Sequence, residues 1–343
     1  MNTINQTNST LHLCIATGQN AANFIPLKQL NAQEVWILET PEMKKQHSGA
    51  NLKLALKHHV ENIQCLDFDD STPQAITYAA AKLASDKLDG RDVVFHITGG
   101  TKLMVLAIHN ELTLLNSGTG KYRTLYTDTK KQTLAWMETL SQENMTDVLT
   151  LNDALLINGY HITNDIRPAK DQQRAAARSK VSRFMAENVS LPYYKKERKI
   201  AELALEHNLP IENNRQFYDG GWLEEYVFLK IQGMQLKPTQ YAMNVKVNQK
   251  HSDTHNEIDA MVVKNNRVLL IECKSGKQID AQDAIYKLGQ VVKQVGGSMA
   301  QGLYVSAKPL TEGDSRRAKE YNIKVIQEDD LPNLSNYLRD WAK

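Results

Sequence analysis

Short apolar runs alternate with longer amphipathic segments along the first 145 residues of the chain. The predicted strands are 11–16, 34–38, 63–68 and 92–97, and the predicted helices are a segment ending at residue 30, 49–59, 73–88 and 103–115. Two further β-rich segments, 122–127 and 132–138, indicate a closing hairpin. Strands that alternate with helices predict an α/β unit with a mainly parallel, Rossmann-like sheet that carries helices on both faces.

The second half is organised around residues 256–274, where two apolar runs flank Lys264-Asn265-Asn266-Arg267. Asn adopts positive φ readily, so Asn265 and Asn266 predict a two-residue hairpin turn in which Lys264 pairs with Arg267. Apolar residues on both faces away from the charged end indicate a covered sheet.

Counting back from this turn places Asp259 opposite Glu272 and Glu257 opposite Lys274 on one face of the hairpin. Two carboxylates that face each other across a strand pair repel, unless a positive group lies between them. Lys274 supplies one positive charge, and Mg²⁺ or Mn²⁺ would supply the rest. A strand pair with a charged, exposed end is the alternative interpretation.

Around this hairpin we expect a further α/β unit with a central mixed sheet. Gly220 and Gly221 precede a predicted helix whose first turn carries Glu224 and Glu225, although acidic residues in a first turn are also expected from the helix dipole alone. A helix is predicted over 280–295, and the last strands over 302–306 and 323–326.

The order G-x-x-E on a helix, an acid on one strand and E-x-K on the next resembles the PD-(D/E)xK nuclease superfamily, whose fold is that of restriction endonucleases. Asp259, Glu272 and Lys274 match the core motif, and Glu224 matches the helix acid. Asp259 and Glu272 would hold the cation with the carbonyl of Cys273, and Glu224 would complete the site through water or bind a second ion. Lys274 would position and help deprotonate the attacking water, or neutralise charge on the phosphate.

Two choices stay open at this point. Glu225 or Glu257 would take the place of Glu224 if the helix register differs. The helix after the E-x-K strand often adds a polar residue that faces the substrate in this superfamily, and here that residue is Lys287 or Gln290, unless both are only surface residues.

Two loops of the first half suit a phosphate-bearing ligand. Thr17-Gly18-Gln19-Asn20, with Asn23 beyond it, follows the first strand, and Thr98-Gly99-Gly100-Thr101-Lys102 leads into a helix. Glycines let the backbone approach a ligand, and a helix N-terminus offers N–H groups to an anion. Neither loop has the spacing of a Walker A or a G-x-G-x-x-G motif, and both are alternatively ordinary strand-to-helix turns.

The sequence T-G-G-T-K-L-M after a strand resembles CARF domains, the sensors of cyclic oligoadenylate in type III CRISPR immunity. A CARF domain joined to a PD-(D/E)xK domain is the layout of one family of CRISPR ancillary nucleases. The resemblance implies a homodimer with a composite ligand pocket, in which Thr17 to Asn20 and Thr98 to Lys102 line the pocket. It also implies that cyclic tetra-adenylate or a related ring activates cleavage of single-stranded DNA or RNA.

Residues 148–160 are predicted to link the two halves, and Pro168 marks the start of a helical region. Residues 170–199 contain nine basic residues and three acidic ones. Arg174, Arg178, Lys180 and Arg183 lie near helical spacing, and Tyr193 and Tyr194 precede Lys195 and Lys196. This segment would follow a nucleic-acid backbone and stack bases, or it is a solvated helix face with tyrosines packed at its base. A further helix is predicted over 200–209.

The expected domains are therefore a sensor at 1–147, a linker with a small basic helical region at 148–212 and a nuclease at 213–343. The formal net charge of +2 in 343 residues indicates no partner by itself. Three cysteines without C-x-x-C spacing are typical of a reducing cytosol, and no signal peptide or membrane span is expected, so we expect a cytoplasmic protein.

Two other functions fit the same patterns. The chain would be a nucleotide-sensing regulator that binds DNA with a catalytically silent nuclease fold, or a restriction or repair nuclease that no cyclic nucleotide controls. The sequence alone does not decide which metal is bound, how large the cyclic oligoadenylate ring is, or whether DNA or RNA is cleaved.

Overall fold

The computed structural model describes residues 10–115, 121–166, 168–191, 193–206, 217–249, 255–276 and 280–343. The chain divides into two compact units. The first comprises Met1–Val148 and Leu156–Gly159, and the second comprises Leu149–Leu155 and Tyr160–Lys343. Within the described ranges, no helix is both long and apolar enough to cross a lipid bilayer.

A seven-stranded sheet in the order β3-β2-β1-β4-β5-β6-β7 forms the centre of the first unit. Its first five strands in this order are parallel, and β6 and β7 are antiparallel. The strands are β1 (Leu11–Ile15), β2 (Glu34–Glu39), β3 (Asn62–Asp67), β4 (Val93–His96), β5 (Tyr122–Asp128), β6 (Thr133–Trp136) and β7 (Ser141–Asn144). The predicted Rossmann-like sheet and its closing hairpin are confirmed, whereas β7 was not predicted because its sequence, Ser-Gln-Glu-Asn, contains no apolar residue.

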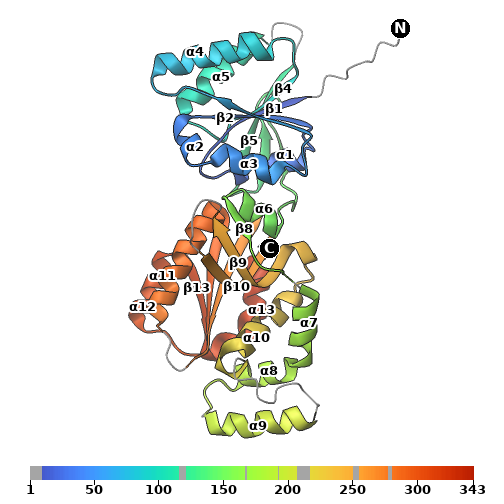
Figure 1. Cartoon of the computed structure of the whole chain (residues 1–343), viewed down its shortest axis with the longest axis vertical. Coiled ribbons are helices and arrows are strands. Elements are labelled where there is room, and N and C mark those ends of the chain that lie inside the picture. The colour runs from blue at the N-terminus through green and yellow to red at the C-terminus, as the bar shows by residue number, and fades with distance from the viewer. Residues whose placement is uncertain are drawn as a thin grey trace, which may run out of the picture. The chain divides into compact units, whose positions relative to one another are not determined.

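Helices cover both faces of this sheet, with α1 and α3 on one side and α4 and α5 on the other (Figure 1). They are α1 (Ala21–Gln29), α2 (Pro41–Lys45), α3 (Ser48–Leu56), α4 (Pro73–Leu83), which continues as a π-helical turn at Ala84–Leu88, and α5 (Lys102–Leu115). Thr72 caps α4, since its side chain accepts from the N–H of Ala75. One core fills the space between the strands and α4 and α5.

The second unit contains a mixed six-stranded sheet in the order β13-β12-β11-β10-β9-β8, as predicted. Strands β11 to β13 are parallel, and β8 to β11 are antiparallel. The strands are β8 (Tyr160–Ile162), β9 (Tyr241–Gln249), β10 (His255–Lys264), β11 (Arg267–Lys274), β12 (Ala300–Ser306) and β13 (Ile323–Gln327). Strands β8 and β9 were not predicted, although the alternation of buried and polar residues in 241–249 is a strand signal.

The predicted hairpin turn is confirmed. Asn265 and Asn266 both have positive φ, 49° and 54°, and Lys264 pairs with Arg267. Asn266 is fully buried, and its Oδ1 accepts from the N–H of Leu149 at 3.2 Å. The turn is therefore packed inside the unit and is not a free loop.

Helices pack on both faces of this sheet as well, with α11 and α12 on one side and α10 and α13 on the other (Figure 1). The helices after the first unit's α5 are α6 (Leu151–Leu156), α7 (Pro168–Ala177), α8 (Ser179–Glu187), α9 (Tyr193–Glu206), α10 (Trp222–Gln232), α11 (Ala281–Val291), α12 (Glu312–Glu320) and α13 (Leu334–Trp341). The predicted helix over 280–295 is α11 together with a π-helical turn at Val292–Gly296.

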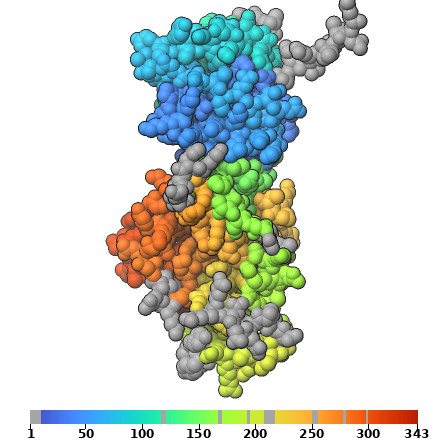
Figure 2. All heavy atoms as spheres, in the orientation of Figure 1, coloured from blue at the N-terminus to red at the C-terminus, as the bar shows by residue number. Residues whose placement is uncertain are grey.

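The basic segment is part of the second unit, where α7 to α9 cover some of its surface in green and yellow-green (Figure 2). Val181, Met185 and Ile200 are buried in the same core as α10 and the strands. The predicted linker likewise ends in β8, which pairs with β9. The side chains of Tyr193 and Tyr194, and residues 207–209 of the predicted helix, lie outside the described part of the chain.

Two buried histidines join β1 to β4 in the first unit. Nδ1 of His12 and Nε2 of His96 are 2.9 Å apart, and the two residues are 6% and 0% exposed. Burial lowers the pKa of His12 from 6.5 to about 4, with a smaller effect of Arg123, and burial holds the pKa of His96 well below its ordinary value. Both rings are therefore neutral at neutral pH.

Acid is expected to destabilise the first unit below pH 6.5. Between that pH and about pH 4 the unfolded chain binds protons at His12 and His96 that the folded sheet excludes, so the free energy of unfolding falls as pH falls. The shift at His12 alone corresponds to roughly 3 kcal/mol. Calorimetric unfolding across this range measures the effect. The double variant His12→Leu/His96→Leu should show a flatter profile, and an unchanged slope in it would contradict this account.

Candidate functional site

Asp259 on β10 and Glu272 and Lys274 on β11 lie on the side of the hairpin away from its turn. The strands keep the predicted register from Lys264 opposite Arg267 to Ala260 opposite Ile271, where their ladder ends. The main-chain N–H of Cys273 then donates to Oδ2 of Asp259 at 2.6 Å. The carboxylate of Asp259 thus bridges β10 and β11 at the point where the backbone ladder stops.

Two other contacts replace the expected pairing of Glu257 with Lys274. Glu257 is opposite Lys246 in the ladder between β10 and β9, and their side chains form an exposed ion pair at 3.7 Å. The ammonium of Lys274 forms an ion pair with Oε1 of Glu272. The register was predicted correctly from Lys264 to Ala260, but the ladder between β10 and β11 ends there and contains neither of the predicted pairs of Asp259 with Glu272 and Glu257 with Lys274.

Asp259 is a partly buried carboxyl with other acids beside it. Burial raises its pKa from 3.8 to about 7, and the charges of Glu272 and Glu224 add to this, while the Cys273 N–H and the Lys274 ammonium oppose it. A carboxyl with such a pKa lacks sufficient positive charge nearby to stabilise its anion. A cation bound here would supply that charge.

Lys274 is a cation in this arrangement. Burial lowers its pKa, but the neighbouring carboxylates of Glu272 and Asp259 outweigh burial, so the net shift is upward. An ammonium with a raised pKa donates charge and hydrogen bonds and does not accept a proton at neutral pH. Its ion pair with Glu272 and its raised pKa suit a role in charge neutralisation better than a role in proton abstraction.

Among the three candidates for the third acid, Glu224 lies in this cluster. Burial raises its pKa, and Lys274 and Glu257 also act on it, so it shares the electrostatic environment of the strand ends. Glu225 is 2% exposed and binds Arg174 and Arg178 instead. The structure thus favours Glu224.

The oxygen atoms available here would suit a hard divalent cation that takes only some of its ligands from the protein. In the described ranges, no three acidic, histidine or cysteine side chains stand close enough together to hold an ion alone. Mg²⁺ and Mn²⁺ need only one or two carboxylates when water and phosphate complete the shell. Asp259 and Glu272 supply these, and Cys273 would contribute its carbonyl, because burial raises the pKa of its thiol well above the ordinary value and keeps it protonated.

Arg174 and Arg178 have a role that sequence analysis missed. The guanidinium of Arg178 is 7% exposed, forms a two-bond ion pair with Glu225 and stacks 4.6 Å from the ring of Phe217. Nε of Arg174 donates to the same carboxylate at 3.1 Å. The prediction that Arg178 contacts a nucleic-acid backbone is wrong, because its charge is buried against α10, and it is not a solvated residue either.

In the first unit the two predicted ligand loops lie side by side, because β1 and β4 are adjacent parallel strands. Their contact requires glycine. A Cβ on Gly99 would lie 2.4 Å from the carbonyl oxygen of Ile15, and one on Gly100, whose φ is +81°, would lie 2.6 Å from that residue's side chain. Gly99 and Gly100 therefore let the second loop pack against the end of β1.

The predicted ligand residues divide into exposed and internal groups. Asn20 and Asn23 are almost completely buried, and their Nδ2 atoms donate to the carbonyls of Ser48 and Ile15. The hydroxyl of Thr98 accepts from the N–H of Thr127 at 2.7 Å. Similar internal bonds involve the hydroxyls of Thr17 and Thr101. The exposed residues of the two loops are Gly18, Gln19, Gly100, Thr101 and Lys102.

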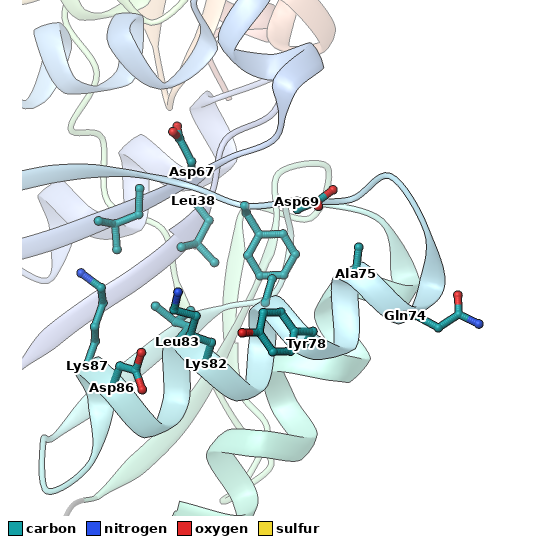
Figure 3. A pocket seen from close by; sticks show the side chains of 13 residues that line it. Leu38, Asp67, Asp69, Gln74, Ala75, Tyr78, Lys82, Leu83, Asp86 and Lys87 are labelled. Carbon is teal, nitrogen blue, oxygen red and sulfur yellow. The ribbon is translucent and has the colours of Figure 1, made fainter.

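A cavity of about 710 Å³ lies elsewhere in this unit, between α4 and the ends of β2 and β3 (Figure 3). Leu38, Phe68 and Leu83 form its apolar floor, and its rim carries acidic and basic side chains such as Asp69 and Lys82. None of the predicted ligand residues lines it. Because acidic and basic side chains both line the rim, the cavity favours neither an anionic nor a cationic ligand.

Three solved structures share the fold. One is Can2 from Sulfobacillus thermosulfidooxidans in complex with cyclic tetra-adenylate, with 20% identity, a TM-score of 0.75 and coverage of 97% of this chain and 99% of that chain. A crystal structure of a Vibrio cholerae protein has 22% identity, a TM-score of 0.81 and coverage of 97% of each chain. A type III CRISPR defence DNA nuclease activated by cyclic oligoadenylate has 17% identity, a TM-score of 0.61 and coverage of 92% of this chain and 47% of that chain. No curated protein sequence matches.

Two families match the sequence itself. Residues 11–154 match the Card1 CARF domain, and residues 211–343 match the endonuclease domain of Card1-like proteins. Both matches confirm the resemblances drawn from the loop and strand motifs. The chain therefore belongs to the proteins that join a CARF domain of the Card1 type to a Card1-like endonuclease domain.

Proposed function

We propose that this protein is a cyclic-oligoadenylate-activated, metal-dependent nuclease that cleaves single-stranded DNA, RNA or both in type III CRISPR defence. The main support for this proposal is the cluster of Asp259, Glu272, Glu224 and Lys274 in a domain that matches the endonuclease family. A catalytically silent nuclease fold would not need three partly buried carboxylates that repel one another. A restriction or repair nuclease would not need the CARF domain.

The residues divide the chemistry of phosphodiester hydrolysis among them. A divalent ion held by Asp259, Glu272 and the carbonyl of Cys273 would polarise the phosphate and acidify a bound water. Lys274, which forms an ion pair with Glu272, would neutralise negative charge that develops on the phosphate. Glu224 would orient the attacking water. On α11, Lys287 lies within electrostatic reach of Glu272 and Lys274, so we propose Lys287 over Gln290 as a contact to substrate phosphate.

The activating ligand is proposed to be cyclic tetra-adenylate, the molecule present in the Can2 complex. The exposed groups of the two loops, with Gln19 and Lys102 foremost, would contact its phosphates. The buried amides of Asn20 and Asn23 would shape the loops. The free cysteines Cys14, Cys65 and Cys273 fit the cytoplasm, where such a ligand would act.

We also propose that the protein is a homodimer through α5, which begins directly after the second loop. This helix exposes Leu103, Leu106 and Leu114, with 42%, 62% and 65% of their surfaces accessible. Exposed leucines at this spacing form a stripe on one helix face, and a two-fold axis would pair the stripe with itself. Such an axis next to the loops would create the composite ligand pocket.

Removing the strand acids should abolish cleavage. Glu272→Gln and Asp259→Asn are expected to lower the rate at least about 100-fold, because each removes a carboxylate from the metal shell. Single-turnover cleavage of labelled single-stranded DNA and RNA with Mn²⁺ and cyclic tetra-adenylate measures the rate. Glu257→Gln is the matched control, since that side chain is exposed and paired with Lys246. Full metal-dependent activity in either strand variant would refute the centre.

The charge of Lys102 is expected to matter for ligand binding. Lys102→Ala should weaken binding of cyclic tetra-adenylate by about tenfold or more, since it removes a positive charge beside the helix N-terminus. Isothermal titration calorimetry on the full chain measures this, with Lys130→Ala in the exposed turn between β5 and β6 as the control. Equal affinity in the wild type and the Lys102 variant would remove this loop from the ligand site.

The dimer is testable through the leucine stripe. Leu106→Glu should give a monomer in light scattering and should lose ring-activated cleavage, because it buries a charge in the interface. Leu140→Glu changes an even more exposed leucine, 82% accessible, and should leave the oligomer intact. A dimeric Leu106→Glu variant would place the interface elsewhere.

A further inference from the structure

The ladder between β9 and β10 omits one pair, and that pair contains a proposed metal ligand. Val245 is opposite Ile258 and Met243 is opposite Ala260, but Asn244 and Asp259 between them are not paired. Asn244 has a φ of +52°, which is left-handed and uncommon in a strand. Asp259 therefore lies at a gap in the ladder with β9 and one residue beyond the end of the ladder with β11.

The side chain of Asn164 holds the irregular part of β9. Its Nδ2 donates to the carbonyl of Asn244 at 2.7 Å, and its Oδ1 accepts from the N–H of Lys246 at 2.9 Å. These two bonds continue the pairing that β8 makes with β9 up to Ile162. The amide of Asn164 thus provides hydrogen bonds to the backbone groups on both sides of Val245. In a regular sheet the backbone of a neighbouring strand would provide them.

We propose that Asn164 is a positioning residue of the nuclease centre: its amide fixes the left-handed turn of β9 at Asn244 and thereby the part of β10 that presents Asp259. This inference rests on the proposed function, in which Asp259 holds the ion. A strand residue in a left-handed conformation persists only when its surroundings hold it there. Without Asn164 the strand relaxes toward regular pairing, and the Asp259 carboxylate loses its fixed direction.

The test measures Mn²⁺ binding to the full chain without turnover, from the electron paramagnetic resonance signal of free Mn²⁺. Asn164→Ala is expected to weaken Mn²⁺ binding about tenfold, the scale of effect found when a partner outside the direct ligands is removed. Thr163→Val is the control, since it removes the adjacent hydroxyl bond to the carbonyl of Lys246 at 3.2 Å and leaves Asn244 untouched. Thermal unfolding verifies that each variant is folded, and Asn164→Leu replaces the alanine variant if that one is not.

The outcomes separate this inference from the function on which it rests. Affinity for Mn²⁺ within about twofold of wild type in a folded Asn164 variant overturns the inference. A loss of affinity in Thr163→Val equal to that in Asn164→Ala also overturns it, because general loosening of β8 would then be the cause. If Asp259→Asn binds Mn²⁺ as tightly as wild type, the proposed metal centre itself is wrong. Loss in Asp259→Asn and Asn164→Ala, with Thr163→Val unchanged, supports both.

Discussion

Repulsion among partly buried carboxylates is the constraint on which the candidate site of the second unit depends. Asp259, Glu272 and Glu224 come from two strands and a helix, and Lys274 opposes the charge of all three. Burial, together with the charges of Glu272 and Glu224, raises the pKa of Asp259 to about 7. A rigid scaffold is needed to hold such groups together, because each would be more stable in water. In the proposed function, a bound cation would relieve this repulsion.

The scaffold supplies this rigidity at three places. The buried turn at Asn265 and Asn266 sets the register that brings Asp259 and Glu272 to the same end of the hairpin. On α10, the paired guanidinium of Arg178 fixes Glu225, and the adjacent Glu224 is thereby directed to the strand ends. On β9, the amide of Asn164 holds the irregular backbone opposite Asp259. If these acids hold an ion as proposed, groups that do not touch the ion would set its geometry.

In the first unit, close packing holds the two candidate ligand loops, whereas charged groups form the candidate site of the second unit. Gly99 and Gly100 allow the loop after β4 to lie against the end of β1, and buried amides such as that of Asn23 tie the loops to the sheet. The exposed glycine, glutamine and lysine groups that remain are those that suit phosphates. Beneath them the neutral pair of His12 and His96 joins the two strands that carry the loops. Loop shape is thus determined by the interior of the sheet.

Local patterns in the sequence determined most strands of the two sheets, the hairpin turn and the residue types of both candidate sites. Period-two and helical spacing report which side of an element is buried, and paired asparagines report a tight turn, so these features need no distant contact to be recognised. Only the tertiary structure decided which of Glu224, Glu225 and Glu257 joins Asp259, since that choice depends on Arg178 and Lys246, which are distant in sequence from their partners. The end of the ladder at Ala260 and the role of Asn164 were likewise invisible, because a side chain that replaces a backbone partner leaves no periodic signal.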